Sequence, residues 1–152
     1  MSLLKFLQSD KIEIINEALS DLERSRLKHY TESNKETNEE RLRNFYDILI
    51  KCVESKSLVE ICDYCEELAN KRFNSGFDLY EVQSTINVLE EIIWKKIIKY
   101  LPPSEYERAL GMITTVLGAG KDSLACKYVS LASQCKKPTL DLSELFNSKE
   151  LS

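Results

Sequence analysis

The sequence predicts an all-α fold, a bundle of five main helices of which the last is long. At five places a Ser, Thr or Asp is followed three residues later by Glu, a pair that can form a capping box. In a capping box each side chain satisfies a free backbone N–H of a helix's first turn. Apolar residues follow each pair at spacings of three and four, as on one face of a helix. No stretch shows the alternation of a strand. The five pairs are Asp10 with Glu13, Thr37 with Glu40, Ser57 with Glu60, Asp78 with Glu81, and Ser104 with Glu107.

The first two predicted helices are separated by a polar segment. The first runs from about residue 11 to the high twenties, and the second from about 38 to 54. Between them, the segment TESNKETNEER has no aliphatic residue and predicts a solvated linker. The inward face of the first helix is Ile12, Ile15, Leu19 and Leu22, and that of the second is Leu42, Phe45, Tyr46, Leu49, Ile50 and Val53.

The third and fourth helices are predicted over 58–75 and 79–100. Gly76 stands where the residue after a helix end adopts a left-handed conformation, and Pro102–Pro103 stops the fourth helix. The fourth helix is apolar over most of its circumference, so it is central or shared with a partner subunit. Its main stripe is Val82, Ile86, Leu89, Ile93 and Ile97, widened by Val88, Ile92 and Trp94.

The last helix, predicted over 105–134, carries a small residue at every seventh position. These residues are Gly111, Gly118, Ala125 and Ala132. Such a stripe lets another helix approach closely, either inside the monomer or at a dimer seam. Together with the excess apolar surface of the fourth helix, it predicts a homodimer.

Composition limits the classes of partner and compartment. The chain has 152 residues and a net charge of -4, which argues against the dense basic face of a nucleic-acid-binding protein. No apolar run approaches a membrane span, and the short apolar patch in the first ten residues argues against a signal peptide. Five cysteines without a framework spacing indicate a reduced, cytoplasmic chain. We expect one domain over 1–135, a tail over 136–152, and no nucleic-acid or membrane partner.

Few residues suggest chemistry, and none forms a catalytic set. Cys62 and Cys65 form a CxxC after Cys52, which fits core packing or, alternatively, redox or metal sensing. The single histidine, His29, fits a structural role at a helix C-terminus, a haem ligand or a phosphoacceptor. We expect a protein that is not an enzyme and has no cofactor.

The tail is predicted to dock into a groove. Past Pro138, the residues expected to make the contact are Leu142, Leu145 and Phe146, which share a face over one helical turn. The groove can belong to the chain's own domain, to its dimer mate or to a downstream partner, by helix-in-groove recognition.

Residues 71–94, KRFNSGFDLYEVQSTINVLEEIIW, resemble the N-terminal domain family of RsbT co-antagonist proteins, of the RsbRD type. The matching features are R-F-x-x-G-F from Arg72 to Phe77, D-L-x-E-V from Asp78 to Val82, and a following helix with Asn87 and Glu90. The resemblance implies a helical input module of the kind placed before an output unit. Related input domains resemble globins that lack haem, so it also implies a bundle that is globin-like without haem.

Two hypotheses of function follow. The first is a non-enzymatic cytoplasmic signalling or stress-response module that acts through protein–protein contacts, as a homodimer with a regulatory partner such as a kinase or an anti-sigma pathway component. No output domain follows the last helix, so we expect it to act alone or through such a partner. The alternative is a small-ligand or haem-type sensor with a pocket between the helices predicted over 38–54, 58–75 and 79–100.

Overall fold

The structure, a computed structural model, describes residues 2–135, and every regular element in this part of the chain is helical. The elements are α1 (Leu3–Ser9), α2 (Lys11–Ser25), α3 (Lys28–Glu32), α4 (Lys35–Ser55), α5 (Val59–Asn74), α6 (Leu79–Tyr100), the 3-10 turn η1 (Pro103–Glu105) and α7 (Tyr106–Cys135). The predicted all-α class and the long last helix are confirmed.

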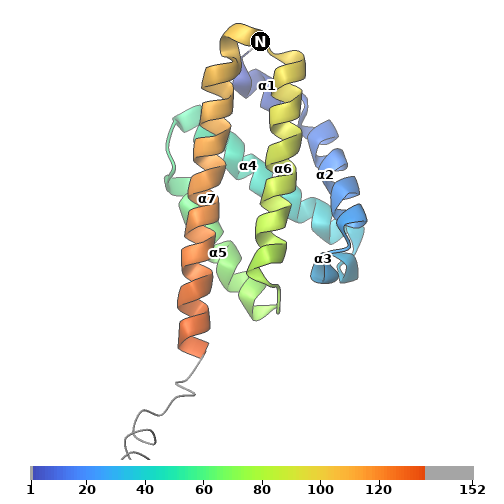
Figure 1. Ribbon diagram of the computed structural model, residues 1–152, viewed down its shortest axis with the longest axis vertical. Helices are drawn as coiled ribbons and strands as arrows, with labels where there is room; N and C mark the ends of the chain where they lie inside the picture. Colours follow the sequence, from blue (N-terminus) through green and yellow to red (C-terminus); the bar gives the residue numbers. More distant parts are fainter. Residues whose placement is uncertain (1, 136–152) are drawn as a thin grey trace, which may run out of the picture.

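The longest helices form an antiparallel pair on one side of the molecule. Figure 1 shows α6 and α7 side by side and joined by η1, with α5 against α7 and α2 against α6. Helix α4 crosses behind the pair and contacts α2, α5 and α7. Helix α6 is therefore flanked on two sides, which explains why its sequence is apolar over so much of its circumference.

The predicted stripe of α6 forms the centre of the core. Val82, Ile86, Leu89, Ile93 and Ile97 are all buried. Of the residues expected to widen the stripe, Ile92 is buried, whereas Trp94 keeps 40% of its surface exposed. Each fully buried aliphatic side chain stabilises the fold by about 1.5–3 kcal/mol relative to its exposed state, so this stripe is a large part of what holds the bundle together.

Two short helices bring the number in residues 2–135 to seven, so the predicted count of five is not confirmed. The five predicted helices correspond to α2, α4, α5, α6 and α7. Helix α1 lies in the first ten residues and buries Phe6 and Leu7. The end of α3 and the start of α4 occupy the segment predicted to be a solvated linker. Asn38 is buried in this segment, and Tyr30 is buried just before it. Helices α1 and α3 are short, seven and five residues, so each offers little periodic pattern to predict it from.

The helices start close to the predicted residues, but at most of these starts the predicted capping box is not formed. The capping box of Asp78 and Glu81 is present. Helix α4 begins earlier than predicted, because Asn34 rather than Thr37 is its N-cap and accepts the Thr37 N–H at 2.7 Å. Asp10 makes no side-chain capping bond.

One residue of the predicted inward face of the first helix was placed wrongly. Ile12 is 75% exposed, and Ile14 and Ala18 are buried in its place beside Ile15, Leu19 and Leu22. Ile12 and Ile14, both near the start of the helix, each fit the helical spacing of the buried residues that follow. The pattern alone therefore does not decide which of the two is buried.

None of the helices in residues 2–135 has both the length and the apolar composition needed to cross a membrane.

Candidate functional site

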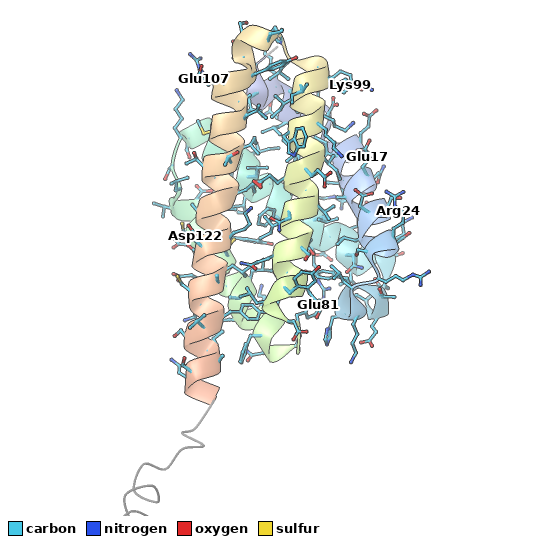
Figure 2. All side chains as sticks on the ribbon, viewed as in Figure 1. Glu17, Arg24, Glu81, Lys99, Glu107 and Asp122 are labelled. Atoms are coloured by element: carbon cyan, nitrogen blue, oxygen red, sulfur yellow. The ribbon has the colours of Figure 1, made fainter. Side chains whose placement is uncertain are left out.

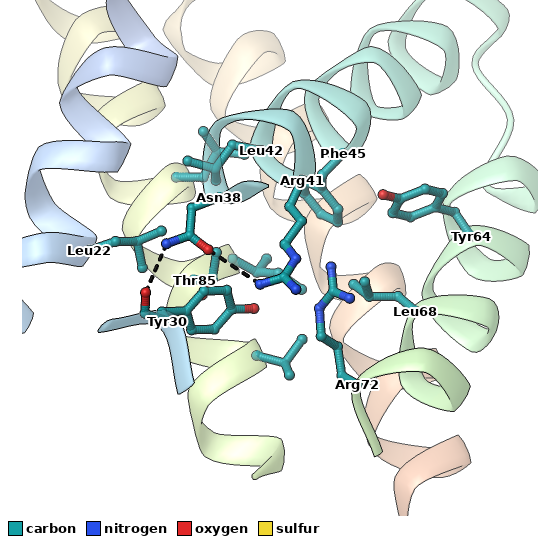
Figure 3. A pocket seen from close by; sticks show the side chains of 13 residues that line it. Leu22, Tyr30, Asn38, Arg41, Leu42, Phe45, Tyr64, Leu68, Arg72 and Thr85 are labelled. Atoms are coloured by element: carbon teal, nitrogen blue, oxygen red, sulfur yellow. Dashed lines mark hydrogen bonds between the residues drawn. The ribbon is translucent and has the colours of Figure 1, made fainter. Parts of the chain in front are cut away.

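A pocket opens between α4, α5 and α6, with α2 and α3 completing its wall. Figure 3 shows its side chains, and its cavity volume is about 30 Å³, room for one or two water molecules. The wall is mostly aliphatic and aromatic, but two arginines enter it. The lining residues are Leu22, Tyr30, Asn38, Arg41, Leu42, Phe45, Tyr64, Leu68, Arg72, Val82, Thr85, Ile86 and Leu89.

Arg72 enters the pocket from the last turn of α5. This helix ends in a Schellman motif, in which the Phe77 N–H donates to Arg72 O at 2.9 Å and the Gly76 N–H to Phe73 O at 3.1 Å. Gly76 has φ +85°, so its predicted left-handed conformation is confirmed. The motif folds Phe77 back beneath Arg72, whose guanidinium carbon lies 5.6 Å from the centre of the Phe77 ring.

Arg41 reaches the same ring from α4, with its guanidinium carbon 5.3 Å from the ring centre of Phe77. Its Nη1 donates to Ser33 Oγ at 3.1 Å and to Asn38 Oδ1 at 3.3 Å. Asn38 in turn donates to Tyr30 O at 2.9 Å. This chain of bonds ties α3 to α4.

Neither guanidinium forms an ion pair with a carboxylate of the described residues. In residues 2–135 no carboxylate oxygen lies within 4 Å of Arg41 or Arg72. Arg72 is only 9% exposed, and its Nε–H has no hydrogen-bond partner. Burial, followed by the positive charge of Arg72, lowers the pKa of Arg41. Arg41 nevertheless stays protonated at neutral pH, because the guanidinium pKa in proteins starts above about 12.

This arrangement is costly unless an anion completes it. A buried polar group without a partner costs about 1–3 kcal/mol, and more when it is charged. The α5 C-terminus offsets part of this cost, because the negative end of a helix favours a cation. Figure 3 shows both guanidiniums and the Tyr30 hydroxyl pointing into one space. Burial raises the pKa of Tyr64, so this phenol stays neutral and can donate a hydrogen bond.

A second cavity connects the arginines with the surface. It has a volume of about 230 Å³ and shares Arg41, Tyr64, Leu68 and Arg72 with the inner pocket. Its remaining lining is polar, and consists of Thr37, Glu40, Asn44, Glu67 and Lys71. We call it the outer groove. The arginine pair thus lies between an apolar inner pocket and a polar groove.

Helix α3 is held over the site by a buried carboxylate of α6. Glu81 accepts the His29 N–H at 2.8 Å, the His29 Nδ1 at 2.6 Å and, in the capping box, the Asp78 N–H at 3.1 Å. Figure 2 shows Glu81 in the first turn of α6, beside α3. Burial alone raises the pKa of Glu81, but these three hydrogen bonds outweigh it and hold the pKa below its usual value. The role of His29 in the structure is to position this carboxylate.

None of the four predicted partner-binding residues that the structure describes, Gly111, Gly118, Ala125 and Ala132, lines this pocket. Leu142, Leu145 and Phe146 are outside the described residues. At Gly111 and Gly118 an added Cβ would meet no described atom within 4 Å, so no helix of residues 2–135 packs closely on them. Ala125 and Ala132, on the same helix, are partly buried. The close approach to α7 occurs instead at Gly120, where a Cβ would lie 2.9 Å from Ile61 Cγ1.

The cysteines of the CxxC lie on α5, facing α7. Cys65 is fully buried, and burial raises its pKa to about 12, so it is a thiol at neutral pH. Cys62 Sγ lies 3.9 Å from Ala119 O. Across residues 2–135, no group of three or more His, Cys, Asp or Glu side chains is placed to hold a metal ion.

The arginine pair was missed by reasoning from the sequence, although one signal for it was present. Arg72 continues the buried stripe of Ile61, Cys65 and Leu68 at spacings of three and four. A charged residue on the inward face of a helix needs a partner or a function. Arg41 carries no such signal, because its convergence on Arg72 depends on how α4 crosses α5.

No family model matches this chain, and neither a curated protein nor a solved structure matches it.

Proposed function

We propose that this protein is a non-enzymatic regulatory module that binds a small anionic ligand between Arg41 and Arg72. One observation carries the proposal: two guanidiniums converge with no carboxylate oxygen of residues 2–135 within 4 Å, and the buried one has an unpartnered Nε–H. Hydrogen bonds between ionised groups are about twice as strong as neutral ones. An anion between the two guanidiniums is therefore bound more strongly than a water molecule in the same place.

The position of the site supports a regulatory role. Its wall is built from five helices, and Tyr30 brings in α3, the shortest of them. Helix α3 is attached through the buried side chain of Tyr30 and a few polar contacts, chiefly those of Glu81 and Asn38. A ligand that bonds to Arg41 competes with or reinforces the bonds of Arg41 to Ser33 and Asn38, and so changes how firmly α3 is held.

The size of the cavity favours a small anion over haem. Pockets for drug-sized ligands usually measure about 300–1,000 Å³, and the inner pocket measures about 30 Å³. An absorption spectrum of the purified protein tests the haem alternative, because bound haem gives a Soret band.

Calorimetry and thermal unfolding test the proposal. The protein is titrated with sodium acetate, phosphate and sulfate at constant ionic strength. A bound anion at ten times its Kd should stabilise the fold by about 1.4 kcal/mol. Arg41→Gln should abolish this gain. Arg43→Gln is the matched control, because Arg43 lies on the same helix, is half exposed and pairs with Glu39. Equal responses of the two variants would contradict the proposal.

The resemblance adds further proposals about context. It supports a globin-like bundle without haem, a cytoplasmic stress-response pathway, and a kinase or anti-sigma pathway component as the partner. A pull-down with the full chain tests the partner, and the anion can be added or withheld to show whether the interaction depends on it.

Dimerisation through the α6–α7 pair is a second candidate function. Trp94 and Ile98 lie one turn apart on α6 and are 40% and 44% exposed. On α7, Gly111 and Gly118 are open to approach by another helix. Light scattering at tens of micromolar should give the dimer mass, and Trp94→Glu should give the monomer mass. A monomer mass for the unmodified protein would remove this candidate.

A further inference from the structure

Building on the proposed anion-binding function, we infer that the ligand is a short-chain monocarboxylate, with its carboxylate between Arg41 and Arg72, its alkyl end in the inner pocket, and its entry through the outer groove.

The charge around the site fits a single negative charge. The side chains that line the inner pocket and the outer groove include three cations, Arg41, Lys71 and Arg72, and two carboxylates, Glu40 and Glu67. Their net charge is +1. A monocarboxylate neutralises it, whereas a phosphate dianion would exceed it and would pass two carboxylates on entry. Like charges in a cleft lower the local concentration of a ligand, so Glu40 and Glu67 select against multiply charged anions.

The donor geometry fits a planar anion. The Nε–H and one Nη–H of a guanidinium form parallel hydrogen bonds to the two oxygens of a carboxylate. In Arg72 the Nε–H has no hydrogen-bond partner, so one of the two donors that such a pair of bonds needs is free. Arg41 and Arg72 both lie near the Phe77 ring, 5.3 and 5.6 Å from its centre, which limits the rotation of both groups. A fixed fork of this kind matches the two oxygens of a carboxylate, and the charge balance around the site favours that anion over a phosphate dianion.

The inner pocket sets the length of the ligand. Beyond the guanidiniums its wall is apolar and its volume is about 30 Å³, which accommodates a short alkyl group rather than a long chain. Each buried methylene should tighten binding by about fourfold until the pocket is full. Affinity should therefore rise from formate to propionate and then level off or fall. The apolar wall consists of Leu22, Leu42, Phe45, Leu68, Val82, Ile86 and Leu89.

Nuclear magnetic resonance of the arginine Nε–H groups tests this inference directly. The full chain is titrated with formate, acetate, propionate, butyrate, hexanoate, phosphate and sulfate at constant ionic strength. We expect a saturable shift of the Arg72 Nε–H resonance, with propionate or butyrate as the tightest ligand. Arg72→Lys keeps the charge but removes the planar fork, and it should weaken binding by at least tenfold. Arg43→Gln, the matched control, should bind propionate as the unmodified protein does.

The possible outcomes distinguish a failure of the monocarboxylate inference from a failure of the proposed anion-binding function. If phosphate or sulfate binds more tightly than every monocarboxylate and depends on Arg72, anion binding stands and the monocarboxylate is ruled out. If affinity rises steadily to hexanoate, the short-chain limit is wrong. If no anion shifts the Arg72 resonance at saturation, the proposed function fails with it. The titration of the unmodified protein decides among these outcomes even if Arg72→Lys does not fold.

Discussion

The backbone of Arg72 stabilises the fold, whereas its buried side chain destabilises it. Its backbone carbonyl accepts the Schellman bond that ends α5, while its side chain is buried beside a like charge with an unpartnered Nε–H. The backbone role is independent of the side chain, so the side chain can be replaced without loss of the motif. The unpaired charge destabilises the unliganded protein, and a cost of this kind is kept where it serves binding.

Arg72→Met should therefore leave the unliganded protein as stable as before or stabilise it by about 1–3 kcal/mol. Replacing a buried charge by an apolar side chain of similar length often has this effect. The same variant should lose all stabilisation by added anions. Chemical denaturation with and without propionate measures both effects. Arg43→Met, at the exposed control position, should change the free energy of unfolding by less than about 0.5 kcal/mol.

Gly76→Ala should destabilise the fold by about 1–2 kcal/mol, the cost of a Cβ in the left-handed conformation. The added methyl would lie 3.6 Å from His29 Nε2, an ordinary contact, so the cost is in the backbone alone. Asn tolerates this conformation better than Ala, so Gly76→Asn should cost less. A midpoint of denaturation that is lower for Asn than for Ala would contradict this explanation.

At the scale of helices, the contact between α5 and α7 depends on one small residue. Gly120 is buried against Ile61 and Cys65, whereas Gly118, one half-turn away, faces open space. Close packing therefore requires a glycine at position 120 but not at position 118. The seven-residue repeat in the sequence marked Gly118 and passed over Gly120.

Gly120→Ala should destabilise the protein by about 1–3 kcal/mol, because the new Cβ would lie 2.9 Å from Ile61 Cγ1 and 3.1 Å from Cys65 Sγ. Gly118→Ala, the matched control, should stabilise it by about 0.5–1 kcal/mol, the gain in helix propensity. Denaturation at a concentration where the protein is monomeric measures both. A Gly120→Ala variant as stable as Gly118→Ala would show that α5 and α7 pack less closely.

The link between α3 and α6 makes stability depend on pH. The lowered pKa of Glu81 means that its ionised form stabilises the fold above its unfolded pKa. That stabilisation is lost as the pH falls through the lower folded pKa. Glu81→Gln should cost about 1–3 kcal/mol at pH 7, and the difference from the unmodified protein should shrink below pH 4.5. Glu91→Gln, at an exposed position of α6, should show little change at either pH.

At the scale of the molecule, a ligand between the arginines should tighten the helices that meet there. We expect saturating propionate to slow amide hydrogen exchange most in α3 and in the segments around Arg41 and Arg72. Helix α1 is the internal control, because it does not line the pocket. Equal slowing throughout would indicate general stabilisation by mass action, without a local response.

The sequence predicted the parts of this fold that follow local rules. The stripe of α6 follows from helical periodicity, and the conformation of Gly76 follows from the way helices end. Predictions failed where tertiary contacts decide, as with Ile12 and with α3, which is held by the burial of Tyr30. The arginine pair belongs to the second kind, because Arg41 and Arg72 meet only once α4 has crossed α5.

The loop that follows α5 also contacts the last helix. The Tyr128 hydroxyl of α7 donates to Phe77 O at 3.0 Å, and the Phe77 ring lies between Arg41, Arg72, His29 and Tyr30. One residue therefore joins the ligand site to α7. Thermodynamic reciprocity then applies: if the anion changes the affinity of α7 for a partner, that partner changes the affinity for the anion by the same factor. Tyr128→Phe should remove part of this coupling and leave both binding surfaces intact.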